Sequence, residues 1–289
     1  MTQKRATPTV ARRRVGGLLR RYRMARGLQT QAAARLMGWD ATRLSRVERG
    51  LYRVSADEVH KLADAYAVDD AAAVDELARA AETPPGTGWW APYIGRFSQA
   101  YLDYIELEAE ATAIKMYHPA VIPGLFQSPG YVRELMAKSL PTFSRERAEM
   151  LVNVRIARQE VLARTDPPVT VHALIPESAL HAECDGGPAV MRDQVRRLLD
   201  LAEAPNITLQ LVPLTVHPAL SGSGAVTILA FRHPWTPVAS LDNPLGGNHL
   251  EGPEQITSME SVFQQGVDLA LPAEETRDKL EEYLEGMRK

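Results

Sequence analysis

The sequence predicts two domains of different fold class: an all-α N-terminal domain of five helices and a larger α+β (or α/β) C-terminal domain with a small mixed sheet. Apolar residues recur every three or four positions up to about residue 81, which is the spacing of amphipathic helices. A stretch rich in Pro and Gly, ETPPGTG, then interrupts the helical pattern. Beyond it, helical stretches alternate with short β-branched runs. We therefore expect domains at 1–82 and 93–289, joined by a linker at 83–92.

The first three expected helices are bounded by residues that commonly start or stop helices. The first helix begins near Pro8 and ends before Gly27, because proline suits a first turn and glycine suits a C-terminus. A second helix is expected over 30–37 and a third over 41–49. Asp40 precedes the third helix, where its side chain can cap the first turn.

Two further helices complete the N-terminal domain. Ser55 and Glu58 form a capping-box pattern that opens a fourth helix, and a fifth helix fits 71–81. The second and third helices are short and joined by a tight turn containing glycine, which is the pattern of a helix-turn-helix unit. Small residues at Ala33 and Ala34 would let these two helices cross closely.

Charge is distributed unevenly along the chain. Residues 1–53 hold fourteen Lys or Arg against two acidic residues, a net charge of +12, whereas residues 54–289 carry a net charge of −15. Clustered arginine near helices is typical of a surface that binds nucleic acid, because each neutralised phosphate releases counterions. The candidates for phosphate neutralisation are Arg12, Arg13, Arg14, Arg49 and Arg53.

The segment GLQTQAAARLMGWDATRLSRVERG, which ends at Gly50, resembles the helix-turn-helix of the Cro and lambda-repressor type, the XRE family. The resemblance implies that helix 41–49 enters the major groove of DNA, which is wide enough for one helix. It also implies a structural ion pair between Arg23 and Glu48. The residues that it assigns to base reading are Ala41, Thr42, Arg43 and Arg46. The residues that it assigns to phosphate contact are Gln29, Thr30 and Gln31, whose order departs from the family's Ser or Thr followed by Gln.

The C-terminal domain is expected to begin with helices and to continue into a sheet. Helical spacing predicts a helix from Tyr101 to Met116. Other helices are expected over 131–137, 146–164, 188–204 and 272–287. Short β-branched runs predict strands over 169–175, 207–212, 225–231 and 238–241.

The same domain resembles the C-terminal domain of actinobacterial regulators described as WhiJ-like or antitoxin-like. The segments that carry this resemblance are YLDYIELEAEA, HPAVIPGLFQSPGYV, RIARQEVLAR, LIPESAL and PNITLQLVPL. The resemblance implies a cytoplasmic regulator, often paired with a small partner protein encoded nearby.

Signs of catalysis or of a metal site are weak. The single cysteine, Cys184, excludes a disulfide framework and a multi-cysteine zinc site. His181 and Glu183 match half of a zinc-deaminase signature whose cysteine pair is missing. We expect no enzyme activity, no metal and no cofactor. The sequence has no apolar run of eighteen residues, so we expect no membrane span and a cytoplasmic location.

Three functions fit these observations. The first is a homodimeric, sequence-specific transcriptional regulator, most simply a repressor or autoregulator. The second is an antitoxin-like protein whose acidic C-terminal domain binds a small partner protein. The third is a repressor that senses a small molecule. The possible ligand or partner surface is formed by Trp89, Trp90, Leu125 and Phe126.

Overall fold

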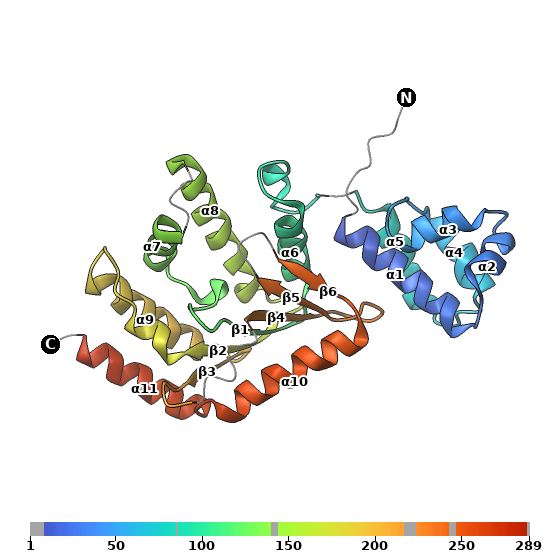
Figure 1. Cartoon of the computed structure of the whole chain (residues 1–289). Helices are drawn as coiled ribbons and strands as arrows, with labels where there is room; N and C mark the ends of the chain where they lie inside the picture. Colours follow the sequence, from blue (N-terminus) through green and yellow to red (C-terminus); the bar gives the residue numbers. More distant parts are fainter. Residues whose placement is uncertain (1–8, 85, 140–143, 217–223, 243–246, 288–289) are drawn as a thin grey trace. The chain divides into compact units, whose positions relative to one another are not determined.

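The computed structural model describes residues 9–84, 86–139, 144–216, 224–242 and 247–287 (Figure 1). Contacts divide the chain into two compact units. The first unit comprises Met1–Leu107 together with Phe231–Thr236, and the second comprises Glu108–Ala230 together with Pro237–Lys289. The first unit therefore extends past the expected linker at 83–92 and takes in a short segment from much later in the chain.

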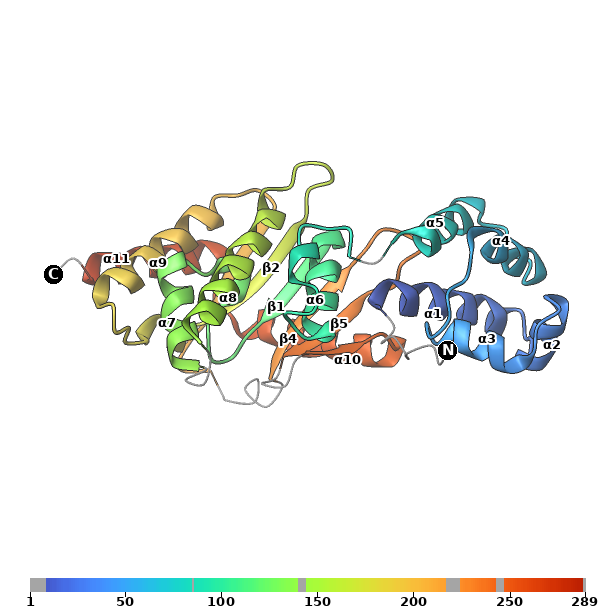
Figure 2. The same cartoon turned by 90° about the horizontal axis from the view of Figure 1, so that it is seen from above.

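The N-terminal region is all-helical, as predicted, and its elements can be followed from above in Figure 2. Its five helices are α1 (Val10–Ala25), α2 (Thr30–Leu36), α3 (Ala41–Glu48), α4 (Ala56–Ala65) and α5 (Ala71–Glu82). Local sequence explains where they start. The Asp40 side chain caps α3 by accepting from the backbone N–H of Arg43, and Ser55 and Glu58 form a complete capping box at α4.

The apolar stripes of these helices meet in one core. Leu19 of α1, Leu44 of α3 and Leu62 of α4 are fully buried in it. Burying each of these leucine side chains on folding stabilises the folded state by about 1.5–3 kcal/mol. Ala33 and Ala34 are buried where α2 meets α3, so the close crossing expected from their small size is present.

The region after α5 departs from expectation. A short 3-10 helix, η1 (Ala91–Tyr93), is followed by α6 (Gln99–Glu110). The helix expected over 101–116 ends at Glu110, and Ala113–Tyr117 form strand β1 instead. The prediction was wrong there because Ile114 and Met116 are buried in a strand inside the sheet. A short apolar run is compatible with both a buried helix and a buried strand, and its sequence does not distinguish the two.

The second unit is built on the predicted mixed sheet, which has six strands in the order β3-β2-β1-β4-β5-β6. The strands are β1, β2 (Thr170–Pro176), β3 (Ile207–Val212), β4 (Ala225–Ala230), β5 (Val238–Asp242) and β6 (Asn248–Leu250). β1, β2 and β3 are parallel, whereas β4 pairs antiparallel with β1 and with β5. The four strands expected from the sequence are confirmed, and β1 and β6 were missed.

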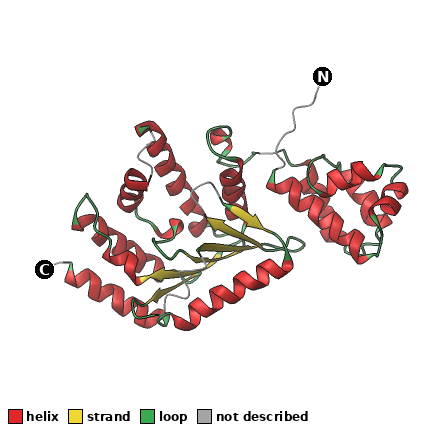
Figure 3. Cartoon of the chain, in the orientation of Figure 1, coloured by secondary structure: helices red, strands yellow, loops and turns green. Residues whose placement is uncertain are grey.

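Helices cover the two faces of this sheet, as the red and yellow elements of Figure 3 show. The helices of this unit are α7 (Pro129–Ser139), α8 (Arg145–Arg158), α9 (Pro188–Ala202), α10 (Pro253–Leu269) and α11 (Ala273–Gly286). Three short 3-10 helices accompany them: η2 (Gly124–Phe126), η3 (Gln159–Ala163) and η4 (Glu177–His181). In Figure 1, α10 lies against one face, and α7, α8 and α9 lie over the other.

The contact between α10 and the sheet forms one of the cores of this unit. Ile256 and Phe263 of α10 pack with Leu174 of β2 and with Val226 and Ile228 of β4. Among the described residues, no helix is long and apolar enough to cross a bilayer.

Candidate nucleic-acid interface

Close backbone packing fixes α3 against α1. A Cβ atom at Gly16 would lie only 2.3 Å from the carbonyl oxygen of Val47. The two helices can approach this closely because residue 16 is a glycine and has no side chain. Gly50, which follows α3, has a φ of +69°, and a Cβ there would lie 2.8 Å from the backbone nitrogen of Arg13. The start of α1 and the end of α3 are thereby held side by side.

A buried ion pair joins the same two helices. The Arg23 Nε donates to Glu48 Oε1 at 2.6 Å, and a terminal nitrogen donates to Oε2 at 2.9 Å. The side chains are 8% and 5% exposed, and Arg23 also donates to the carbonyl oxygen of Leu28. The hydrogen bond to Glu48 raises the pKa of Arg23. Arg23 and Glu48, which were expected to pair, therefore act inside the fold and are not exposed to a ligand.

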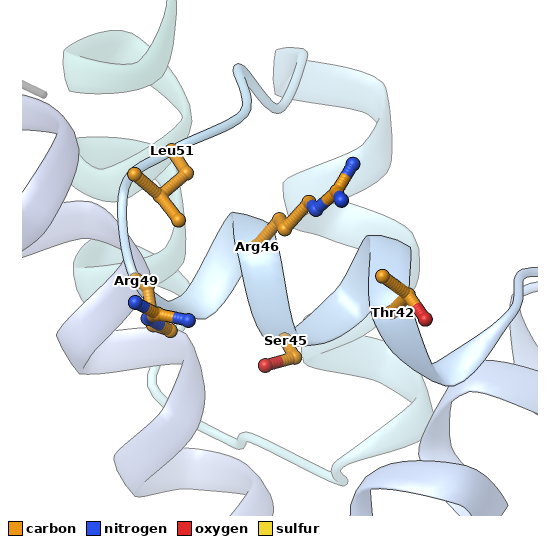
Figure 4. A pocket seen from close by; sticks show the side chains of 5 residues that line it. All are labelled: Thr42, Ser45, Arg46, Arg49 and Leu51. Atoms are coloured by element: carbon orange, nitrogen blue, oxygen red, sulfur yellow. The ribbon is translucent and has the colours of Figure 1, made fainter. Parts of the chain in front are cut away.

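The outer face of α3 carries polar and cationic side chains around a surface depression of about 450 Å³. Figure 4 shows Thr42, Ser45, Arg46 and Arg49 projecting from α3 and its C-cap, with Leu51 from the turn that follows. Thr42, Arg46 and Arg49 are exposed. Ser45 and Leu51 were missed in the sequence, although Ser45 lies one helical turn after Thr42 and the helical period could have identified it.

Arg46 is the base-reading candidate with the least internal competition for its guanidinium. It donates to the hydroxyl of Tyr52, and its guanidinium carbon lies 5.1 Å from the centre of the Tyr52 ring. Both side chains are exposed, so this contact orients Arg46 without burying its charge. Tyr52 was not identified from the sequence.

Arg43 has stronger partners within the protein. It forms an ion pair of 2.5 Å with Glu58, the residue that completes the α4 capping box, and stacks 4.1 Å from the ring of Trp39. Contact with a base would require Arg43 to leave Glu58. Ala41 is half-buried at the first position of α3.

The five arginines predicted to neutralise phosphates differ in availability. Arg49 and Arg53 are exposed. Burial of the Arg12 guanidinium, and to a smaller extent the nearby charge of Arg53, lowers the pKa of Arg12. Arg13 forms an ion pair of 2.9 Å with Asp103.

Arg14 does not fit the phosphate role that was predicted for it. Its side chain is buried in the first unit, with its guanidinium carbon 3.9 Å from the Phe231 ring centre and 4.7 Å from that of Trp235. The prediction was wrong because successive side chains on a helix project in different directions, and of the three consecutive arginines Arg14 is the one that projects into the interior.

The residues predicted to contact phosphate lie at the start of α2, the helix that follows α1 in the chain. Gln29 is the N-cap residue, and its side chain makes no capping hydrogen bond. Gln29 and Gln31 are exposed, and Thr30 is half-buried. Gln29 is thus the cap, and Thr30, at the first position of α2, follows it by one place.

Comparison with known families covers most of the chain. A model described as a helix-turn-helix domain matches residues 14–85, which include α2 and α3. A model described as a domain of unknown function, DUF5753, matches residues 101–282, more than half of the chain. The chain belongs to the DUF5753 family. A search of curated proteins finds no match to this chain, and neither does a search of solved structures.

The surface expected from four hydrophobic residues does not form as predicted. Leu125 and Phe126 of the DUF5753 region are fully buried, because η2 inserts them into the core of the second unit. Trp89 is 38% exposed, and Trp90 is half-buried, with the two rings 5.9 Å apart at a steep angle. Leu125 and Phe126 are therefore core residues.

The interior of the DUF5753 region contains its own buried ion pair. Arg158 of α8 donates to both carboxylate oxygens of Glu108, at 2.7 and 2.8 Å. His118 lies near this pair, and burial, followed by the charges of Arg155 and Arg158, lowers its pKa to about 4. In the described ranges, no group of three or more His, Cys, Asp or Glu side chains is arranged to hold a metal ion.

Proposed function

We propose that this protein is a sequence-specific DNA-binding transcriptional regulator that places α3 in the major groove. The observation that carries the proposal is the exposed face of α3, where Thr42, Ser45 and Arg46 surround a depression and Arg49 adds positive charge. A major groove admits one helix, and arginine can donate two hydrogen bonds to guanine. The match to a helix-turn-helix domain supports this assignment.

We assign base reading to Thr42 and Arg46, with Ala41 close to the groove and Arg43 reaching a base after release from Glu58. Ser45 is added to this face. The residues that we assign to the phosphates are Arg12, Arg49, Arg53, Gln29, Thr30 and Gln31. Because these residues flank α3 on both sides in the chain, their contacts would set its position on the duplex.

Arg46→Ala should weaken binding to the preferred sequence and relax the preference at one base position. A bidentate arginine contact contributes about 1–3 kcal/mol of discrimination. Arg49→Ala should instead weaken binding to all sequences alike and lower the slope of log K against log salt by about 1. Sites selected from random DNA, with affinities measured at several salt concentrations, provide the measurement.

Two outcomes would count against this assignment. Equal losses for both variants on every sequence would mean that Arg46 does not read a base. A wild-type chain with no salt-dependent affinity for any duplex would overturn the proposed function. Arg49 is preferred to Arg13 as the phosphate variant because Arg13 is already paired with Asp103.

We further propose that the protein acts as a homodimer and represses transcription, including that of its own gene. One eight-residue helix contacts few base pairs, and the usual solution is two copies on half-sites about 34–36 Å apart. The resemblance of the segment ending at Gly50 to XRE-family regulators supports this architecture, as does the WhiJ-like sequence of the C-terminal region.

A further inference from the structure

A six-residue segment between β4 and β5 is part of the DNA-binding unit. The chain leaves the second unit at Ala230, contributes Phe231–Thr236 to the first unit, and returns to the second at Pro237. We call Phe231–Thr236 the clasp. It lies within the DUF5753 match at residues 101–282 and outside the helix-turn-helix match at residues 14–85.

Two aromatic rings of the clasp hold α1. The guanidinium of Arg14 lies over both Phe231 and Trp235, at 3.9 and 4.7 Å from the ring centres. A cation that lies over two rings, away from water, is attracted to the electron density of both. Trp235 also packs against the hydrophobic core that Leu19 and Leu44 help to form.

Two polar contacts attach the clasp to α5. The indole nitrogen of Trp235 donates to Glu76 at 3.0 Å, and His233 Nε2 lies 2.7 Å from an Asp70 carboxylate oxygen. Asp70 is also the N-cap of α5, where it accepts from the backbone N–H of Ala73. The hydrogen bond from Ala73, and then that from His233, lowers the pKa of Asp70. The clasp therefore joins the first and last helices of the helix-turn-helix region.

The position of α1 determines the position of α3. The backbone of α1 at Gly16 touches Val47, and Arg23 is buried against Glu48. Asp103, a second residue within the DUF5753 match, holds the start of α1 by pairing with Arg13 and accepting from the backbone N–H of Val10 at 3.3 Å. A displacement of α1 would therefore be transmitted to the helix that carries Thr42, Ser45 and Arg46.

We propose that the clasp is a positioning element of the DNA-binding surface, so that one role of the DUF5753 region is to complete and orient the helix-turn-helix. This inference rests on the proposed function of α3. It has a direct consequence: a fragment containing residues 1–107 lacks the clasp side chains that contact Arg14, Asp70 and Glu76, and does not represent the complete DNA-binding unit.

The test compares Trp235→Ala with Trp89→Ala in the full-length chain. Trp89 is a matched control, because it is a tryptophan of the same unit, is 38% exposed and lies outside the clasp. Trp235→Ala should speed hydrogen exchange in α1 and α5 without DNA and raise the Kd for selected DNA by about tenfold, since it removes a stacked ring and a hydrogen bond to a carboxylate. Trp89→Ala should change neither quantity more than about twofold.

Trp235→Phe and His233→Ala keep the proposal testable if Trp235→Ala does not fold. Trp235→Phe keeps a ring for Arg14 and removes the donor to Glu76, and His233→Ala removes the contact with Asp70, so each should show a smaller effect in the same direction. A DNA Kd unchanged in all clasp variants, even where the melting temperature falls, would overturn the positioning role. Failure of the wild type to bind DNA would instead refute the function of α3, while the exchange comparison would still decide whether the clasp holds α1 and α5.

Discussion

Replacing Arg23 with alanine is expected to lower the free energy of unfolding of the first unit by about 3–5 kcal/mol, because Glu48 would remain as a buried charge without its partner. Glu48 is 5% exposed on its side chain and receives two hydrogen bonds from Arg23. Chemical denaturation, followed by hydrogen exchange in α1 and α3, measures the loss. DNA affinity should fall with it, because the pair joins α1 to α3, the helix that we propose enters the major groove.

Arg20→Ala is the matched control for Arg23→Ala. Arg20 lies on the same helix, so replacing it with alanine changes the charge and the helix propensity by the same amounts as Arg23→Ala does. Arg20 is exposed, so no buried charge is left without a partner. Its effect should stay within about 0.5 kcal/mol. Replacing both members of the pair, as in Arg23→Met with Glu48→Leu, should recover much of the stability, since no buried charge is left. Equal stabilities of Arg20→Ala and Arg23→Ala would contradict the proposed role of the pair.

Gly16→Ala is expected to destabilise the first unit and to weaken DNA binding together. The added methyl group would lie 2.3 Å from the Val47 carbonyl oxygen and 2.8 Å from that of Glu48, and both atoms belong to the backbone of α3. The helices must separate to accept it, at a cost of about 1–3 kcal/mol, which is typical of overpacking. Urea denaturation and DNA titration of the same sample measure the two effects.

Gly17→Ala provides a control with the opposite sign. A Cβ atom at Gly17 would have no atom within 4 Å apart from its neighbours in the chain and the backbone of its own helix, so this change adds helix propensity without a clash. It should stabilise the unit by about 0.5–1 kcal/mol. If both alanine variants were more stable than the wild type, the contact between α1 and α3 would be looser than the structure indicates.

Local signals in the sequence were sufficient for the helices of the N-terminal region. The caps at Asp40 and Ser55 and the stripe containing Leu44 and Leu62 act within a few residues of the chain, and these short-range interactions are the ones that periodicity and capping patterns record. Strand β1 was missed for the opposite reason. Its five residues become a strand through pairing with β2 and β4, which lie more than fifty residues away.

The sequence alone determined the class of the two regions, the helix that presents Thr42 and Arg46, and the uneven distribution of charge. The tertiary structure decided which of the predicted arginines are accessible: Arg49 is exposed, Arg13 is paired, and Arg14 is buried over the rings of residues 231 and 235. The physical reason is the distance along the chain over which the deciding interactions act. Helix periodicity and caps depend on neighbours in the chain, whereas the fate of a charged side chain depends on whatever distant segment the fold brings against it.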